Sequence, residues 1–180
     1  KISEQNIQLR QIEGTDVTEN EWQHFYAYYQ ATYLKRSGHG GYLNPDFFIQ
    51  LKDNMAEQLM LVTATKNDEM IGAALYLKDK ESLYGRYWGS YSDDEFLHFE
   101  ACYYQGIEYC IQHCLNYFDP GVQGEHKLQR GFEPYFTYSN HWIVHPEFRL
   151  AINQFLQDEC PYVEDYFSYT QTRLPFKKAD

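Results

Sequence analysis

The sequence predicts an α/β (α+β) fold in which helices flank a mixed, mostly antiparallel sheet. Three apolar runs, at 59–65, 70–77 and 82–88, are separated by short charged turns, as in meandering strands. Apolar residues at helical spacing stand before and after these runs. The chain has 180 residues, of which 43% are hydrophobic and 18% aromatic, and this is enough to build one buried core without disulfides or metals.

The first third of the chain predicts one strand and two helices. Residues 7–12 alternate apolar and polar in part, which is typical of a short half-buried strand. Thr18 and Glu21 form a capping box that predicts a helix start, and the glycines after Ser37 predict its end. The Asn-Pro pair at 44–45 then predicts the start of a second helix.

The second half of the chain predicts further helices and one more strand. A cluster of acidic residues predicts the start of the longest helix, over about 93–118, which is apolar nearly all round. After a short piece at 123–127, we expect a strand over 138–144 and a helix opened by Pro146. The sequence contains no linker or internal repeat, so we expect a single domain over 1–180.

The predicted order of elements resembles that of the GNAT acyltransferase fold, a likeness that implies fold more than function. GNAT enzymes bind the coenzyme A pyrophosphate at a strand-to-helix junction, and residues 86–90 (Arg-Tyr-Trp-Gly-Ser) match the first part of that pattern. Tyr91 departs from the small residue expected next, and the carboxylates at 93–95 would repel a pyrophosphate. We therefore expect this junction to disfavour coenzyme A.

Charge and cysteine usage exclude several classes of protein. The chain has 15 Lys and Arg against 26 Asp and Glu, and the net charge of −11 argues against binding nucleic acid, DNA included, or an anionic membrane by bulk charge, which leaves a local basic pocket open. No apolar stretch is long enough for a membrane span. The four cysteines form no CxxC pair, which indicates reduced thiols and a cytoplasmic location. Because the chain begins with Lys1, we expect it to be part of a longer protein.

A glycine-rich loop at 121–134 is the first candidate site. Its candidate residues are Gln123, His126, Lys127 and Arg130. Two cationic side chains and a titratable imidazole this close together suit an anionic ligand or a developing oxyanion. The alternative is a surface loop whose charges pair with Glu125 and Glu133.

The long predicted helix carries the second candidate set. Its members are His98, Glu100, Tyr104, Gln105 and Glu108. Glu100 and Tyr104 are four residues apart and share a face of a regular helix. A Glu100 buried in an apolar helix would have a raised pKa and could act as a general base toward an amine. The alternative is that Glu100 pairs with Arg86 or Arg130 and locks the helix to the sheet.

Histidines and cysteines at i, i+4 spacing on the same helix do not predict a metal site. Zinc needs four ligands with satisfied surroundings, and buried cysteines usually behave as small hydrophobic residues. No cysteine stands where it would be activated as a nucleophile. We therefore expect no metal.

Several motifs resemble the C-terminal half of a FemAB-like, GNAT-related bacterial family that is labelled peptidoglycan biosynthesis or recognition. They are Phe-Leu-His-Phe-Glu at 96–100, Cys-Tyr-Tyr-Gln at 102–105, Gly-Glu-His-Lys-x-x-Arg-Gly-Phe at 124–132 and Tyr-Ser-x-His-Trp-Ile at 138–143. The resemblance implies a two-lobed protein in which this chain is the C-terminal lobe and an N-terminal lobe is its partner. It also carries over seven positions: Glu100, Tyr104, Gln105, Gln123, His126, Lys127 and Arg130.

The first functional hypothesis is an N-acyltransferase lobe that joins an activated acyl or aminoacyl group to an amine. The family implies a peptidoglycan precursor as acceptor, and either acyl-CoA or aminoacyl-tRNA as donor. Glu100 or His126 would accept the amine proton, Tyr104 would protonate the leaving group, and the other candidates would bind substrate. Those others are Arg86, His98, Gln105, Gln123, Lys127 and Arg130. The alternative hypothesis is a non-catalytic module that recognises muropeptides through its Tyr and Trp rings.

Overall fold

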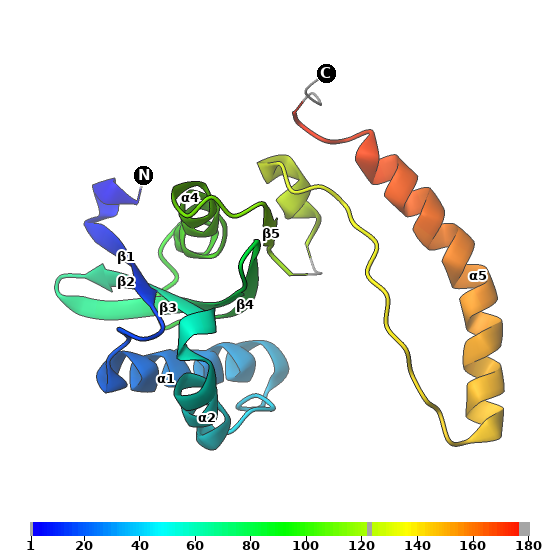
Figure 1. Cartoon of the computed structure of the whole chain (residues 1–180), viewed down its shortest axis with the longest axis horizontal. Helices are drawn as coiled ribbons and strands as arrows, with labels where there is room; N and C mark the ends of the chain where they lie inside the picture. Colours follow the sequence, from blue (N-terminus) through cyan, green and yellow to red (C-terminus); the bar gives the residue numbers. More distant parts are fainter. Residues whose placement is uncertain (1, 122–123, 177–180) are drawn as a thin grey trace. The chain divides into compact units, whose positions relative to one another are not determined.

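The computed structural model describes residues 2–121 and 124–176. Its internal contacts divide the chain into two compact units, residues 1–121 and 122–180. A single domain over 1–180 stays a prediction. The first unit contains a sheet with helices on both faces (Figure 1). The described part of the second unit contains a short 3-10 helix and one long α-helix.

The sheet of the first unit has the order β1-β2-β3-β4-β5, so strands that are consecutive in the chain lie side by side. The first four strands pair antiparallel and β5 pairs parallel with β4, which confirms the mixed, mostly antiparallel sheet. The strands are β1 (Ile7–Glu13), β2 (Leu59–Lys66), β3 (Glu69–Lys78), β4 (Ser82–Ser90) and β5 (Tyr117–Asp119). The β2–β3 hairpin turns at Asn67 and Asp68, which both have positive φ as a tight two-residue turn requires.

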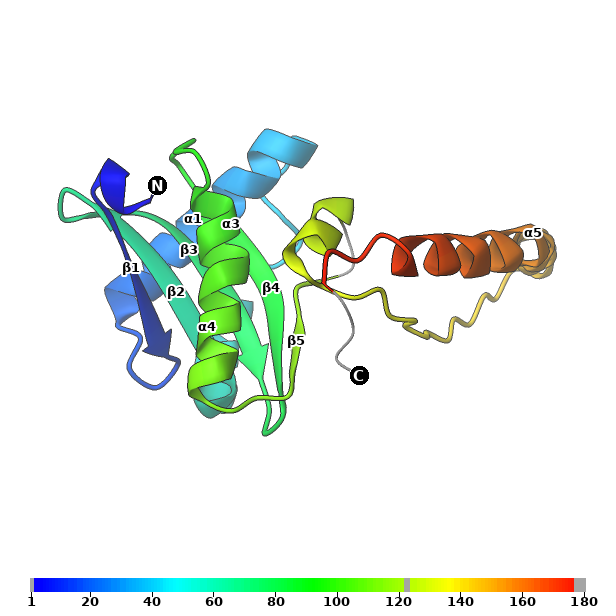
Figure 2. The ribbon, with the colours of Figure 1, turned by 90° about the horizontal axis from the view of Figure 1, so that it is seen from above.

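Helices cover both faces of this sheet (Figure 2). One face carries α1 (Glu19–Ser37) and α2 (Pro45–Met55). The other face carries one continuous helix made of α3 (Leu97–Phe99), the π-helical turn η3 (Glu100–Tyr104) and α4 (Gln105–Gln112). Two short 3-10 helices, η1 (Ser3–Gln5) and η2 (Ala56–Gln58), precede β1 and β2.

The predicted start and end of α1 and the predicted start of α2 are confirmed by their caps. The Thr18 hydroxyl accepts from the Glu21 backbone N–H, and the Glu21 carboxylate accepts from the Thr18 N–H at 2.8 Å. Gly38, with a φ of +73°, ends α1 in the left-handed region. Asn44 Oδ1 accepts from the Phe47 N–H at 2.9 Å, and a proline is the first residue of α2.

The core of the first unit lies on both faces of β2 and β3. Toward α1 and α2 it is mainly aromatic, with Trp22, Phe25, Tyr28, Tyr29 and Phe48. Toward α4 it is mainly aliphatic around one tyrosine, with Met60, Val62, Ala74, Tyr76, Leu83, Ala101, Tyr109 and Cys110. Strands buried on both faces have continuous apolar runs rather than alternation, and this explains the sequence pattern at 59–65 and 70–77.

The long helix predicted over 93–118 is wrong at both ends. It begins at Leu97, because serine and aspartate side chains hold residues 90–94 in a loop and Phe96 has a φ of +68°. It ends at Gln112, and Cys114 with a φ of +55° turns the chain. The last predicted turn of the helix is instead strand β5, whose backbone pairs with β4.

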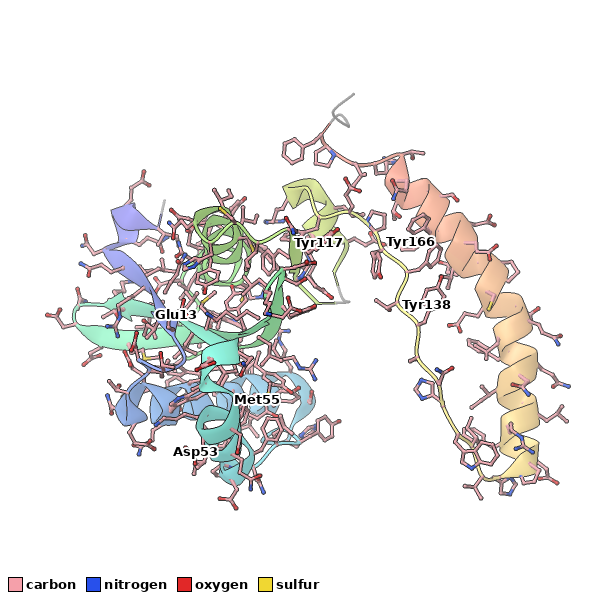
Figure 3. All side chains as sticks on the ribbon, viewed as in Figure 1. Glu13, Asp53, Met55, Tyr117, Tyr138 and Tyr166 are labelled. Carbon is pink, nitrogen blue, oxygen red and sulfur yellow. The ribbon has the colours of Figure 1, made fainter. Side chains whose placement is uncertain are left out.

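In the second unit, η4 (Glu125–Arg130) is followed by an extended segment and α5 (Pro146–Gln171). The helix opened by Pro146 is confirmed, whereas the strand over 138–144 is wrong because the described second unit has no neighbouring strand to pair with it. Figure 3 shows Tyr138 on this segment. Tyr138 is 90% exposed. Gln123, with the start of the piece predicted at 123–127, lies outside the described residues.

Candidate functional site

The outer edge of β4 is only partly covered by a neighbouring strand. Strand β5 pairs only with Ser82, Leu83 and Tyr84, and the chain then leaves through a proline and a glycine. We call residues 85–90 the open edge of β4, because no strand among residues 2–121 pairs with them on the side away from β3. Such an edge presents backbone N–H and C=O groups to a ligand.

A β-bulge lies at the start of this open edge. Leu75 pairs with Tyr87 but Tyr76 pairs with Gly85, so Arg86 is the extra residue of β4. Bulges are common next to active sites because they re-aim a side chain. Arg86 is exposed, and its guanidinium carbon lies 5.1 Å from the centre of the Tyr87 ring.

His98 lies beside the same strand. Its half-buried ring is 5.7 Å from the Trp88 ring of β4 and 5.5 Å from the rings of both Phe99 and Tyr103. These contacts place His98 on the flank of the α3–α4 helix that faces β4. Arg86 and His98, which the sequence predicted as substrate-binding residues, therefore both belong to the β4 side of the first unit.

Glu100 begins the π-helical turn, where the Gln105 backbone N–H donates to the Glu100 carbonyl five residues before it. The wide turn brings the Glu100 side chain to Gln105, whose Nε2 donates to Glu100 Oε1 at 3.2 Å. In a regular helix Glu100 would instead share a face with Tyr104, as the sequence predicted. The Tyr104 side chain is about half exposed. The π-helical turn has no local sequence signature, so this pairing could not be predicted.

The α3–α4 helix separates the predicted residues into two groups. Gln105 is hydrogen-bonded to Gln11 of β1, whereas Arg86 lies on β4, and these strands are three positions apart, about 14 Å at the usual strand spacing. Glu100 and Gln105 thus lie on the flank toward β1, opposite His98. Within residues 2–121, the structure brings Glu100 to an amide and not to Arg86.

In the second unit, η4 brings three predicted residues together. The Arg130 Nη1 donates to the His126 carbonyl at 2.7 Å, and Lys127 lies beside them on the same short helix. Burial lowers the pKa of the His126 imidazole, and the charges of Arg130 and Lys127 lower it further. Glu125, the alternative partner for these charges, accepts a hydrogen bond from Tyr166 of α5 at 2.7 Å. The lowered pKa favours the neutral form of the His126 imidazole.

The junction between β4 and α3 does not fit a pyrophosphate. The Ser92 backbone N–H donates to Ser90 Oγ at 2.9 Å, and the Asp94 N–H donates to Ser92 Oγ at 3.1 Å. Asp94 is bound by Lys66 at 2.7 Å, and this hydrogen bond, with one from Ser92, keeps the pKa of Asp94 below its usual value. A pyrophosphate needs free N–H groups and a positive field, whereas these amides are already used and the junction carries carboxylates.

Sequence reasoning missed a polar cluster where β1, β3 and α4 meet. Lys78 Nζ is bonded to Glu13 and lies 2.9 Å from the Tyr109 hydroxyl, which itself donates to Glu13 Oε1 at 2.6 Å. Burial tends to raise the pKa of Glu13, but hydrogen bonds from Lys78 and Tyr109 outweigh it and lower the pKa. The members come from three distant segments, and the only sequence signal is a charge at the end of each of two apolar runs.

Acid is expected to weaken this cluster. Because the folded pKa of Glu13 lies below its usual 4.5, its carboxylate stabilises the fold above about pH 4.5, and that contribution is lost as the pH falls through the folded pKa. We expect Glu13→Gln to lower the free energy of unfolding near pH 7 and to lower it by less near pH 3, measured by urea denaturation. Glu57→Gln, at an exposed carboxylate, is the control. A loss of equal size at both pH values would contradict this role.

Across residues 2–121 and 124–176, no three His, Cys, Asp or Glu side chains come together as metal ligands. None of the helices in these ranges combines the length and the apolar character needed to cross a bilayer.

Solved acetyltransferases share this fold. A possible acetyltransferase from Clostridium difficile 630 matches with a TM-score of 0.55 and 9% identity, over 77% of this chain and 99% of that chain. A GNAT family acetyltransferase from Staphylococcus aureus matches with a TM-score of 0.51 and 11% identity, over 77% and 99%. An aminoglycoside N-acetyltransferase in complex with CoA matches with a TM-score of 0.51 and 10% identity, over 77% and 95%. The structural similarity confirms the GNAT-like fold, and at such low sequence identity it shows the fold alone.

No curated protein sequence matches the chain. One family model does, and it covers residues 1–178. Its description, FemAB-like peptidoglycan biosynthesis/recognition, agrees with the motifs at 96–105 and 124–132. Together with the structural likeness, this match indicates an acyl-transfer fold. The chain belongs to the FemAB-like family of peptidoglycan biosynthesis/recognition proteins.

Proposed function

We propose that the chain is an N-acyltransferase domain that transfers an activated acyl or aminoacyl group to an amine. The observation that supports this best is the open edge of β4 beside the parallel strand β5. The outer backbone groups of that edge can hydrogen-bond an extended acyl donor, as a sheet edge binds an extended peptide. The bulge places Arg86, an exposed planar cation, at this edge, where it suits a carboxylate or a phosphate.

His126 is the proposed proton acceptor. Its lowered pKa keeps the imidazole neutral near neutral pH, and only the neutral form can take a proton from an attacking amine. Lys127 and Arg130, on the same short helix, would hold an anionic part of donor or acceptor. Tyr104, which is about half exposed, is the proposed donor of a proton to the leaving group.

The proposed donor is an aminoacyl ester rather than a coenzyme A thioester. The β4–α3 junction argues against a pyrophosphate, because its amides are bonded to serine hydroxyls and its carboxylates are fixed there. Family membership supports a peptidoglycan-precursor amine as acceptor. We further propose aminoacyl-tRNA as the carrier of the donor, an N-terminal lobe of the same protein as partner, and a cytoplasmic location.

A second candidate function is recognition of muropeptides without chemistry. It is favoured by the exposed rings of the second unit, where Tyr135, Tyr138 and Trp142 stand on the extended segment, each more than 80% exposed. Exposed aromatic rings with a polar edge are suited to the apolar faces of sugars. This function predicts saturable muropeptide binding with no transfer from any donor.

A binding titration tests the donor. We expect the chain to bind aminoacyl-tRNA saturably and acetyl-CoA only weakly, because the Ser92 and Asp94 amides of the junction are already bonded to serine hydroxyls. Arg130→Ala should weaken binding of the anionic donor, whereas Gln129→Ala, an exposed neutral residue on the same helix, should not. Saturable acetyl-CoA binding that survives salt would overturn the assignment of the donor.

A further inference from the structure

The π-helical turn at Glu100–Tyr104 is an unusual feature inside a helix that otherwise packs regularly. It adds one residue to a single turn, and so it rotates the side chains of α4 about the helix axis relative to those of α3. Before the turn, Leu97 is buried against the sheet. After it, Tyr109 reaches Glu13 of β1, and Gly106 lies so close to Phe118 of β5 that an added Cβ would come within 2.4 Å of that ring. The extra residue therefore lets both halves of the helix fit the same sheet.

Two strands hold this turn in place. From β3, the buried Tyr76 hydroxyl donates to the Ala101 carbonyl. From β1, Gln11 Nε2 donates to both the carbonyl oxygen and the side-chain Oε1 of Gln105, at 3.0 Å each. Accepting through its Oε1 orients the Gln105 amide, so that its Nε2 points at Glu100. A continuous chain of hydrogen bonds thus runs from β1 through Gln11 and Gln105 to Glu100.

Glu100 also lies on the wrong flank to serve the open edge of β4. His98 packs on β4, and Glu100 is two residues further along the helix, about 200° around its axis. Gln105, which binds Glu100, is tied to β1 at the opposite side of the sheet. We propose that Glu100 is a positioning residue that, with Gln105 and Gln11, fastens the π-helical turn to β1, and that it is not the proton acceptor. The proposal rests on the N-acyltransferase function for its activity readout only.

An uncharged amide could do the same work as Glu100. The contact needs an oxygen that accepts from Gln105 Nε2, and the side-chain oxygen of a glutamine supplies one. The same Nε2 lies 3.5 Å from Glu108 Oε2, so the Gln105 amide sits between two carboxylates. Glu100→Gln removes one of these two negative charges and keeps the hydrogen bond between residue 100 and Gln105, so the turn stays attached to β1. A proton acceptor, by contrast, cannot be replaced by an amide.

Four variants of the full chain test the proposal: Glu100→Gln, Glu100→Leu, Gln11→Leu and the control Gln8→Leu, at an exposed position on the same strand. Hydrogen exchange of the backbone amides at 101–106 measures the fastening without any substrate. We expect exchange there to rise about five- to tenfold in Glu100→Leu and Gln11→Leu, as loss of a hydrogen bond allows, and to stay unchanged in Glu100→Gln and Gln8→Leu. Unchanged exchange in Gln11→Leu would contradict the claim that Gln11 holds the π-helical turn on β1.

Turnover from aminoacyl-tRNA separates positioning from proton transfer. Glu100→Gln should keep turnover within about threefold of the parent with the same pH profile, whereas loss of a proton acceptor would cost about 10²–10⁴-fold. A loss of that size with unchanged exchange would overturn the positioning role. If the parent chain shows no turnover with any donor, the N-acyltransferase function fails, and the exchange comparison still decides whether Glu100 and Gln11 fasten the turn.

Discussion

Replacing His126 by alanine is expected to lower kcat/KM for acyl transfer about 10²–10⁴-fold, because the attacking amine loses the group that takes its proton. The parent enzyme should also lose activity as the pH falls below about 6.5, through the lowered pKa of His126, since the protonated imidazole cannot accept. Initial rates measured across the pH range check both expectations. The variant should show no such acid limb.

Gln129→Ala is the matched control for His126→Ala, because it removes an exposed side chain from the same 3-10 helix. It should retain the rate and the pH profile of the parent. Circular dichroism before each assay shows whether a variant has kept its fold. A folded His126→Ala variant with the parental rate would remove His126 from the chemistry and transfer the role of proton acceptor to another residue.

Replacing Gly89 by alanine is expected to destabilise the first unit by about 3 kcal/mol, the upper end of the usual cost of overpacking. Helix α1 packs so closely on β4 here that a Cβ on Gly89 would lie 2.2 Å from the Tyr28 carbonyl carbon and 2.3 Å from its oxygen. Backbone atoms of a packed helix cannot move aside as a flexible side chain does. Urea denaturation of the parent and the variant measures the loss.

Gly85→Ala provides the comparison on the same strand. A Cβ on Gly85 would meet its nearest neighbour, Pro120, at 3.6 Å, which is ordinary contact. We expect this variant to stay within about 0.5 kcal/mol of the parent. Equal losses in the two variants would show that glycine in β4 matters for backbone freedom and not for the approach of α1.

Local signals in the sequence predicted most of the first unit. Capping residues and apolar spacing located α1 and α2, and the turn at 66–69 located the β2–β3 hairpin. The failures involve contacts between distant segments. Tyr117–Asp119 is a strand only because β4 lies beside it, and 138–144 is not one because no partner strand is there among the described residues. Alternation of apolar residues predicts which face of a strand is buried, but it does not predict which strand pairs with it.

The candidate site was predicted as residue types rather than as an arrangement. The loop motif located His126, Lys127 and Arg130, which do share one short helix. Helical spacing paired Glu100 with Tyr104, but the π-helical turn pairs it with Gln105 instead. The π-helical turn has no sequence signature. Neither does the hydrogen bond from Gln11 to Gln105, which lies 94 residues later in the chain. The bulge at Arg86 likewise depends on the register between β3 and β4.

Acyl transfer measured by mass spectrometry tests the central claim most directly. The chain is incubated with a peptidoglycan-precursor amine and either aminoacyl-tRNA or acetyl-CoA, and the mass of the acceptor is followed over time. We expect the acceptor to gain one aminoacyl group from aminoacyl-tRNA, at a rate that collapses in His126→Ala, and to gain no acetyl group from acetyl-CoA. An acceptor that binds saturably but gains no mass from either donor would contradict the N-acyltransferase function and leave recognition as the function of the chain.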